Sequence, residues 1–129
     1  MPQAIDLIVK NGAAVDKTFT VISPAAGDGG VAQWALKEGT ISAVFPAFTC
    51  SSSSRPKGRN LKLKYTQPSS FTDAVTGLTM VNNRAEINVS VSIPSDFPEA
   101  LKNDFVAYSV NLLNHAFVKS LIRDAVPAT

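Results

Sequence analysis

Residues 55–65, with the sequence RPKGRNLKLKY, concentrate the positive charge of the chain. They hold five of its twelve basic residues and no acid. Lysine and arginine side chains bind nucleic-acid phosphates, and these contacts supply the sequence-independent part of the affinity. The stretch could therefore bind a polyanion, although its charges would also suit an ordinary solvated strand and turn. The whole chain carries a net charge of only +2, so any such binding would depend on this local patch.

The alternation within residues 61–65 predicts how the charge is placed. Lys62 and Lys64 alternate with Leu61, Leu63 and Tyr65. Successive side chains of a β-strand point to opposite faces, so the two lysines would share one face and the apolar residues the other. Residues 86–93, EINVSVSI, repeat the same pattern. Two strands therefore predict a sheet with one buried face and one polar face.

Catalytic and metal-binding chemistry has little support in the sequence. Cys50 and His115 could act as a nucleophile and its base. However, Cys50 alternates with Thr49 and Ser51, so it is expected on the apolar face as a structural thiol. His115 follows Asn114 at a predicted helix junction, where a capping or interface role is simpler. One cysteine and one histidine form neither an internal disulfide nor a zinc cluster, and we expect neither enzyme activity nor a cofactor.

The first 93 residues are predicted to form a sheet. A hairpin is expected around Asn11-Gly12. The predicted strands are 5–9, 18–22, 31–36, 41–51, 59–67 and 80–93. Pro46 indicates an edge position or a bulge in the fourth of these strands. The segments 51–58 and 68–78 are predicted to be a polar turn and a loop.

Residues 95–126 are predicted to be helical, with a break at Asn114-His115. Asp96 and Glu99 have the spacing of a capping box, and Pro98 suits a first helical turn. Two apolar stripes lie side by side on the first helix: Leu101, Phe105, Tyr108 and Leu112, and Val106, Val110, Leu113 and Phe117. One stripe could cover the chain's own sheet while the other contacts a second subunit.

These elements predict one α+β domain over residues 1–129. An N-terminal hairpin and an antiparallel meander would be followed by two helices that cover one face of the sheet. The apolar runs are far shorter than the about 20 residues that span a bilayer, so no membrane partner is expected. The segment 1–6 lacks the basic start and apolar core of a secretory signal, which favours an intracellular origin.

Five short stretches, taken in order, resemble one known family. They are 30–34 (GVAQW), 49–51 (TCS), the basic strand 59–68, 75–77 (VTG) and 84–94. The family is that of the coat proteins of single-stranded RNA bacteriophages, the leviviruses. Its members carry the similar stretches GVAEW, TCS and VNG in the same order. The resemblance spans nearly the whole chain.

The resemblance implies an obligate homodimer with a continuous antiparallel sheet and interlocked helices. Dimers would assemble in the cytoplasm of the bacterial host into the icosahedral T=3 shell of a virion, with the polar face of the sheet turned toward single-stranded viral RNA. A dimer would also bind one RNA hairpin at the replicase start, which represses translation and marks the genome for packaging. The alternative is a small cellular RNA-binding dimer, such as a translational regulator, that builds no shell.

The resemblance also assigns positions that contact RNA. By motif, these map onto Val31, Thr49, Ser51, Lys64 and Asn88. Lys62 and Arg59 of the basic strand join them as candidate RNA-binding residues, while Arg55 and Lys57 stay open between RNA contact and solvation. Glu86 is the eighth candidate, at a position where the well-known hairpin binders carry a tyrosine that stacks on a base, which contributes about 1–3 kcal/mol. A carboxylate repels phosphate instead, so the hairpin or the mode of specific recognition is expected to differ.

Overall fold

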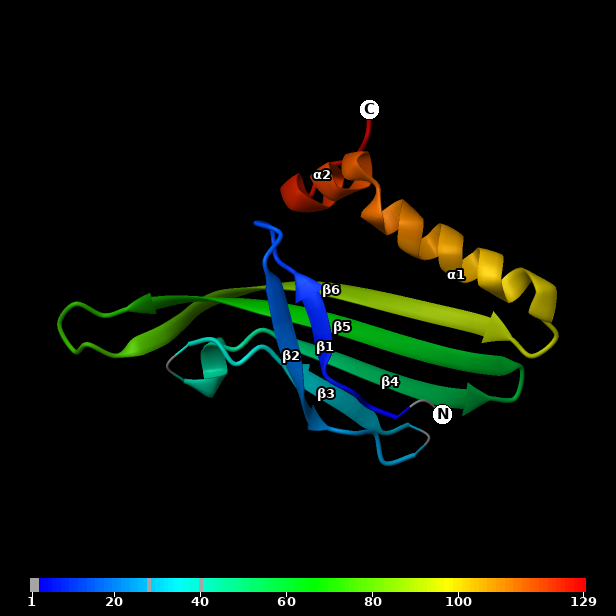
Figure 1. Ribbon diagram of the computed structural model, residues 1–129, viewed down its shortest axis with the longest axis horizontal. Helices are drawn as coiled ribbons and strands as arrows, with labels where there is room; N and C mark the ends of the chain where they lie inside the picture. Colours follow the sequence, from blue (N-terminus) through cyan, green and yellow to red (C-terminus); the bar gives the residue numbers. More distant parts are fainter. Residues whose placement is uncertain (1–2, 28, 40) are drawn as a thin grey trace. The chain divides into compact units, whose positions relative to one another are not determined.

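The computed structural model describes residues 3–27, 29–39 and 41–129 (Figure 1). Met1 and Pro2 of the segment tested for a secretory signal lie outside the described residues. So do Asp28, between the second and third predicted strands, and Thr40, just before the fourth. The chain divides into two compact units, residues 1–94 and residues 95–129.

The first unit is a six-stranded sheet whose strands follow one another in chain order. The strands are β1 (Leu7–Lys10), β2 (Asp16–Ser23), β3 (Val31–Ala35), β4 (Ala47–Arg55), β5 (Gly58–Thr72) and β6 (Thr79–Pro94). Each strand pairs antiparallel with the next, and β2 carries an irregularity in its register with β3. The predicted hairpin and antiparallel meander are therefore confirmed.

Three predicted boundaries were wrong. A short 3-10 helix, η1 (Ser42–Val44), occupies part of the predicted strand 41–51, and β4 begins only after Pro46. The serines at 51–54 continue β4, because β5 offers backbone partners along their whole length. The loop predicted at 68–78 shrinks to 73–78, since β5 and β6 stay paired as far as Thr72 and Thr79.

A two-residue turn, Pro56-Lys57, joins β4 to β5 and sets their register. Arg55 pairs with Gly58 across this turn. Gly58 has a positive φ of 158°, and a Cβ at this position would collide with the carbonyl oxygen of Ile93 on β6. A residue without a side chain therefore lets β6 approach the turn closely.

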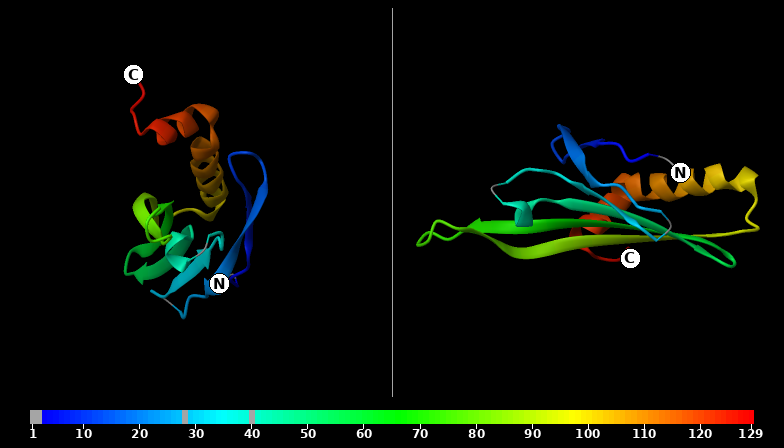
Figure 2. Two further views of the ribbon diagram at one scale, coloured as in Figure 1. Left: turned by 90° about the vertical axis from the view of Figure 1, so that its left-hand side faces the viewer. Right: turned by 90° about the horizontal axis from the view of Figure 1, so that it is seen from below.

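The β1–β2 hairpin crosses the apolar side of the sheet (Figures 1 and 2). Trp34 on β3 is only 8% exposed, and its ring packs against Phe48 with centroids 5.5 Å apart. Its Nε1–H donates a hydrogen bond to the carbonyl oxygen of Ile5 at 2.7 Å. Phe19 on β2 contacts Tyr65 edge-to-face at 6.1 Å. The Trp34–Ile5 hydrogen bond and the Phe19–Tyr65 contact hold the N-terminal segment and the hairpin against the sheet, whereas Trp34 and Phe48 pack within the sheet.

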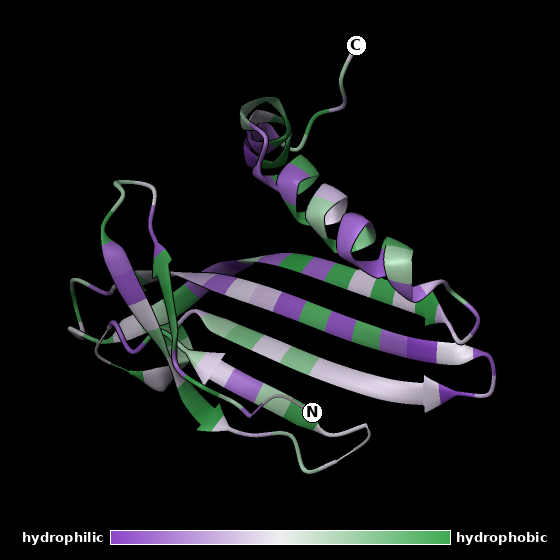
Figure 3. Ribbon diagram, turned by 45° about the vertical axis from the view of Figure 1, so that its right-hand side comes forward, coloured by the Kyte–Doolittle hydropathy of each residue, from purple (hydrophilic) through white to green (hydrophobic). Residues whose placement is uncertain are grey.

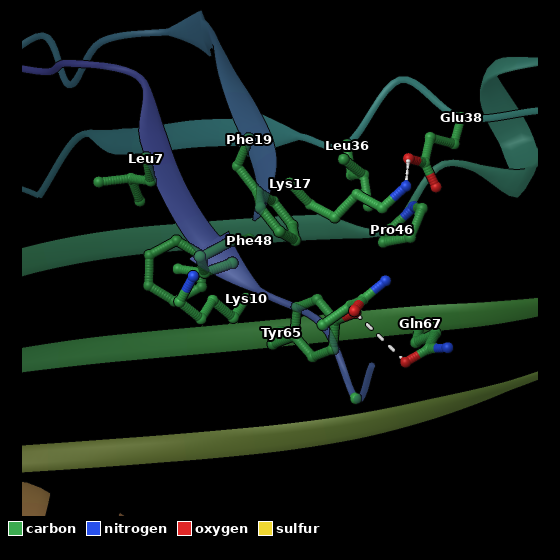
Figure 4. A pocket seen from close by; sticks show the side chains of 13 residues that line it. Leu7, Lys10, Lys17, Phe19, Leu36, Glu38, Pro46, Phe48, Tyr65 and Gln67 are labelled. Carbon is green, nitrogen blue, oxygen red and sulfur yellow. Dashed lines mark hydrogen bonds and ion pairs between the residues drawn. The ribbon is translucent and has the colours of Figure 1, made fainter. Parts of the chain in front are cut away.

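A cavity of about 650 Å³ lies between this hairpin and the sheet (Figure 4). Leu7, Phe19, Phe48 and Tyr65 contribute apolar walls, and the Lys17–Glu38 ion pair (2.7 Å) also lines it. The hairpin therefore covers the apolar side of its own sheet incompletely.

The second unit consists of α1 (Glu99–Asn114) and α2 (Ala116–Asp124). The break at Asn114-His115 is confirmed, and His115 caps α2 because its Nδ1 accepts a hydrogen bond from the backbone N–H of Phe117 at 3.2 Å. The predicted capping box was wrong. Asp96 lies in a preceding turn, and Pro98, which has no polar side-chain atom, occupies the N-cap position. None of the helices in the described ranges is long and apolar enough to cross a membrane.

The apolar side chains of the helices stay exposed within the chain. Neither α1 nor α2 contains a buried residue, and Tyr108, Leu112 and Val110 are 68%, 63% and 58% exposed. Exposed apolar surface that is continuous along a helix marks an interaction surface. The two predicted stripes are therefore available to a partner, although Phe117, the last member of the second stripe, lies in α2 beyond the break and not on α1.

Replacing Trp34 by Phe should destabilise the sheet unit by about 1–3 kcal/mol, because it removes a hydrogen bond and leaves a partial void beside Phe48. The measurement is urea unfolding followed by circular dichroism, since Trp34 is the only tryptophan and its fluorescence is absent from the variant. Val75→Ala, at a side chain 93% exposed, is the control and should leave the unfolding midpoint unchanged. Equal midpoints for all three proteins would contradict the assigned role of Trp34.

Candidate nucleic-acid interface

Polar side chains form rows across β3, β4, β5 and β6 because the strands lie in continuous register. One row consists of Gln33, Thr49, Lys64 and Asn88. The adjacent row consists of Val31, Ser51, Lys62 and Ser90. Positions two residues apart in a strand share a face, so both rows lie on the same side of the sheet. With Glu86 in the next row of the same side, the structure therefore brings together seven of the eight predicted RNA-binding residues, all except Arg59.

The opposite side carries the apolar positions. Hydrophilic and hydrophobic residues alternate along β5 and β6 (Figure 3). Lys62 and Lys64 are exposed, whereas Leu61, Leu63 and Tyr65, which alternate with them, are half-buried. The two-faced sheet predicted from residues 61–65 and 86–93 is thus present. We refer to the side with the lysines as the polar face, defined by Thr49, Ser51, Arg55, Lys62, Lys64, Arg84, Glu86 and Asn88.

Glu86 lies in the row next to Lys64, where it faces Thr66 of β5. Its Oε1 is 3.5 Å from the Nζ of Lys64, and the two side chains are 43% and 46% exposed. This diagonal pair links β5 to β6 and places a negative charge beside one of the two candidate lysines. The pairing could not be seen in the sequence, because it depends on the register between two strands.

Two arginines extend the positive charge of the polar face. Arg84 lies two residues before Glu86 and is exposed. Arg55 lies at the other end, beyond Ser51 on β4. With the Asn60 amide oriented so that both of its polar atoms are bonded, its oxygen accepts from Arg55 Nε at 2.8 Å and its nitrogen donates to Ser92 Oγ at 3.2 Å. The period-two pattern of β6 would have identified Arg84, which was not predicted.

Arg59 lies on the other side of the sheet, which corrects its grouping with the lysines. It pairs with Ser54 and Ile93 in the ladder and shares a face with Leu61. Its guanidinium donates to Ser54 Oγ at 2.8 Å and to Ser52 Oγ at 3.4 Å. The physical reason is the odd spacing: Lys62 comes three positions after Arg59, and an odd separation in a strand reverses the face. Lys57 is exposed in the turn between β4 and β5.

Cys50 lies on the apolar side, opposite Ala32 and Leu63. Burial raises the pKa of its thiol above the ordinary value, and it raises the pKa of the Tyr65 phenol on the same side. Activated catalytic thiols show the reverse shift, toward a lower pKa. Nowhere in the ranges 3–27, 29–39 and 41–129 do three or more His, Cys, Asp or Glu side chains gather as a metal site would require.

Solved structures share this architecture over nearly the whole chain. The protein of a virus-like particle of bacteriophage NT-214 is 19% identical, with 97% of this chain and 96% of that chain covered and a TM-score of 0.82. For the virus-like particle of Beihai levi-like virus 21 the identity is 18%, both chains are covered to 99%, and the TM-score is 0.82. The capsid protein of bacteriophage GA is 20% identical, with 95% of each chain covered and a TM-score of 0.68.

No protein-family model and no curated protein sequence matches the chain. The structural likeness shows a shared fold: an antiparallel six-stranded sheet followed by two C-terminal helices. The fold implied by the resemblance to levivirus coat proteins is therefore confirmed.

Cys50 should react slowly with Ellman's reagent in the folded protein. A raised pKa leaves a smaller thiolate fraction at a given pH, so the profile of rate against pH should shift to higher pH than in the unfolded chain. The measurement compares these profiles with and without urea. Cys50 is the only cysteine, so Cys50→Ser should show no reaction and serves as the blank. Superimposable profiles in the two states would contradict the placement of the thiol.

Proposed function

We propose that the chain is the coat protein of a single-stranded RNA bacteriophage, which dimerises, assembles into an icosahedral shell and packages RNA. One observation carries the proposal: the fold matches, from end to end, proteins described as virus-like particles and as a phage capsid. Identities of 18–20% make this an inference about function drawn from a shared fold. The two surface features described next support it independently.

The first feature is a sheet and a helix pair that each lack a partner surface. β6 lies at one edge of the strand order, with β5 as its neighbour. Its sixteen residues present backbone N–H and C=O groups that a second β6 could bind. The apolar stripes of α1 would then pack against the second copy, which would bury side chains such as Tyr108 and Leu112. A homodimer with a continuous sheet and interlocked helices satisfies both needs.

The second feature is the polar face. Its four cations, Arg55, Lys62, Lys64 and Arg84, outnumber its single carboxylate, and a dimer would double this charge. Phosphate contacts of this kind are independent of sequence, which suits the packing of a whole genome. Inside a T=3 shell this face would line the interior of the virion, and assembly would take place in the host cytoplasm.

The row formed by Thr49, Lys64 and Asn88 suits a more specific contact. The Asn88 amide can both donate to and accept from a base or a sugar, and the Thr49 hydroxyl can do the same. Lys64 between them can bind a phosphate. We place the contact with a genomic hairpin, and through it the repression of replicase translation, on this row. Glu86 supplies no stacking surface beside it, so the hairpin would differ from those read through a tyrosine.

Expression of the chain alone in bacteria tests whether it forms shells. Electron microscopy of the purified fraction should show uniform closed particles, and the ratio of absorbance at 260 nm to that at 280 nm should reveal packaged nucleic acid. A soluble dimer without particles would contradict the coat role and favour the non-assembling RNA-binding regulator.

Replacing Lys62 and Lys64 together by Thr should lower the RNA content of the particles while dimers still form. The salt dependence of RNA binding should flatten by about 0.7 in logarithmic slope for each phosphate that the variant no longer binds. Lys10→Thr with Lys37→Thr removes the same charge outside the polar face and is the matched control. Lys10 pairs with Asp16 within the N-terminal hairpin, and Lys37 follows β3. An unchanged RNA content and slope in the Lys62/Lys64 variant would exclude these lysines from RNA contact.

A further inference from the structure

Glu86 is the only acidic residue in β4, β5 and β6. It lies on the polar face, among the cations proposed to bind RNA. Its carboxylate reaches one of them, with 3.5 Å between Glu86 Oε1 and Lys64 Nζ. Lys62, two residues away on the same strand and face, forms no ion pair with any residue that the structure describes. An incoming anion therefore meets one lysine that is paired with a carboxylate, Lys64, and one that is not, Lys62.

The carboxylate opposes a phosphate at Lys64 in two ways. A phosphate bound to the Lys64 ammonium would lie within a few ångströms of the Glu86 oxygens, and like charges at that distance repel. The Lys64–Glu86 pair also has no net charge. It therefore neutralises less of the phosphate charge of a bound RNA than an unpaired lysine would. Both effects lower the affinity of this position for an RNA backbone without affecting Lys62.

The exposure of the pair sets the size of the effect. Both side chains are more than two-fifths exposed, so solvent screens the attraction. Exposed pairs of this kind change an equilibrium constant by a factor of up to about five. Glu86 would therefore attenuate phosphate binding at Lys64 without abolishing it, and an RNA that offers further contacts to the row could still displace it.

We propose that Glu86 is a specificity-determining residue that competes with RNA phosphate for Lys64 and so weakens non-specific binding to the Thr49–Lys64–Asn88 row. The inference rests on the proposed RNA-binding function of the polar face. It divides that face into a general part, where Lys62, Arg55 and Arg84 bind backbone, and a selective part around Lys64. Rejecting unwanted partners with an opposing charge is a common route to specificity.

The test uses Glu86→Gln in the full-length, unassembled protein, freed of nucleic acid. Binding to a short single-stranded oligouridylate is measured by fluorescence anisotropy across a series of salt concentrations. Glu86→Gln should bind about two- to fivefold more tightly than the natural protein at low salt. Its logarithmic salt slope should be steeper by up to about 0.7 per protomer. The glutamine side chain has the same shape as that of Glu86, which is exposed, and circular dichroism checks that the variant keeps the fold.

Glu38→Gln is the matched control. Glu38 is 52% exposed and forms an ion pair with Lys17 at 2.7 Å, so the variant makes the same change in charge at a similar pair. Glu38 lines the cavity beneath the N-terminal hairpin, outside the polar face. Its replacement should leave the affinity and the salt slope unchanged. An equal gain in Glu38→Gln would mean that only net charge matters, which would overturn the inference.

A second substitution tests whether the effect passes through Lys64. The gain from Glu86→Gln is measured against the protein that carries the lysine substitution alone. In the Lys64→Thr background the gain should disappear, whereas in the Lys62→Thr background it should persist. A gain that survives Lys64→Thr would overturn the competition between Glu86 and phosphate. Salt-dependent binding by the natural protein, with no change in Glu86→Gln, would overturn this inference and leave the proposed RNA-binding function standing. Absence of RNA binding by both proteins would overturn the proposed function as well.

Discussion

The register between β4, β5 and β6 determines most of what this chain presents to its surroundings. The middle of β5 and the second half of β6 alternate in character, and the register aligns their polar residues with Thr49 and Ser51 of β4. A slip of one residue in β5 would move Lys62 and Lys64 to the apolar side. The tight turn at Pro56-Lys57 sets the register at one end, and Gly58 lets β6 approach it there. Both the polar face and the apolar side are consequences of this alignment.

The same alignment leaves the chain with more apolar surface than it covers. The β1–β2 hairpin spans only part of the sheet, and a cavity remains beneath it. The helices contribute no buried side chain of their own. Exposed apolar area on this scale is unfavourable in water, so the stable form of the protein should bury it against another surface. In the proposed dimer, folding and association would therefore be one thermodynamic process, as in many obligate homodimers.

Local pattern predicted the two faces of the sheet well, because alternation is visible within five residues of one strand. It failed wherever a partner strand decides the outcome. Ser51–Ser54 resemble a turn because serine side chains compete for backbone hydrogen bonds, yet the ladder with β5 keeps them extended. Arg59 was grouped by its charge although its odd spacing from Lys62 places it on the other side. The Lys64–Glu86 pair joins residues 22 positions apart, and only the register brings them together.

The distribution of charge on the polar face is informative because the face is so weakly charged for a proposed RNA-binding surface. Hydroxyl and amide side chains such as Ser51, Ser90 and Asn88 occupy positions where further lysines would have fitted the strand pattern. Such groups bond to RNA without attracting it from a distance, so they add contacts that depend on geometry. Cations alone would bind any polyanion with similar strength. A sparse set of cations, one of them already paired with Glu86, shifts the balance toward ligands that match the positions of the hydroxyls and amides. Selectivity on this face would then come from the small number of unpaired cations as much as from any single contact.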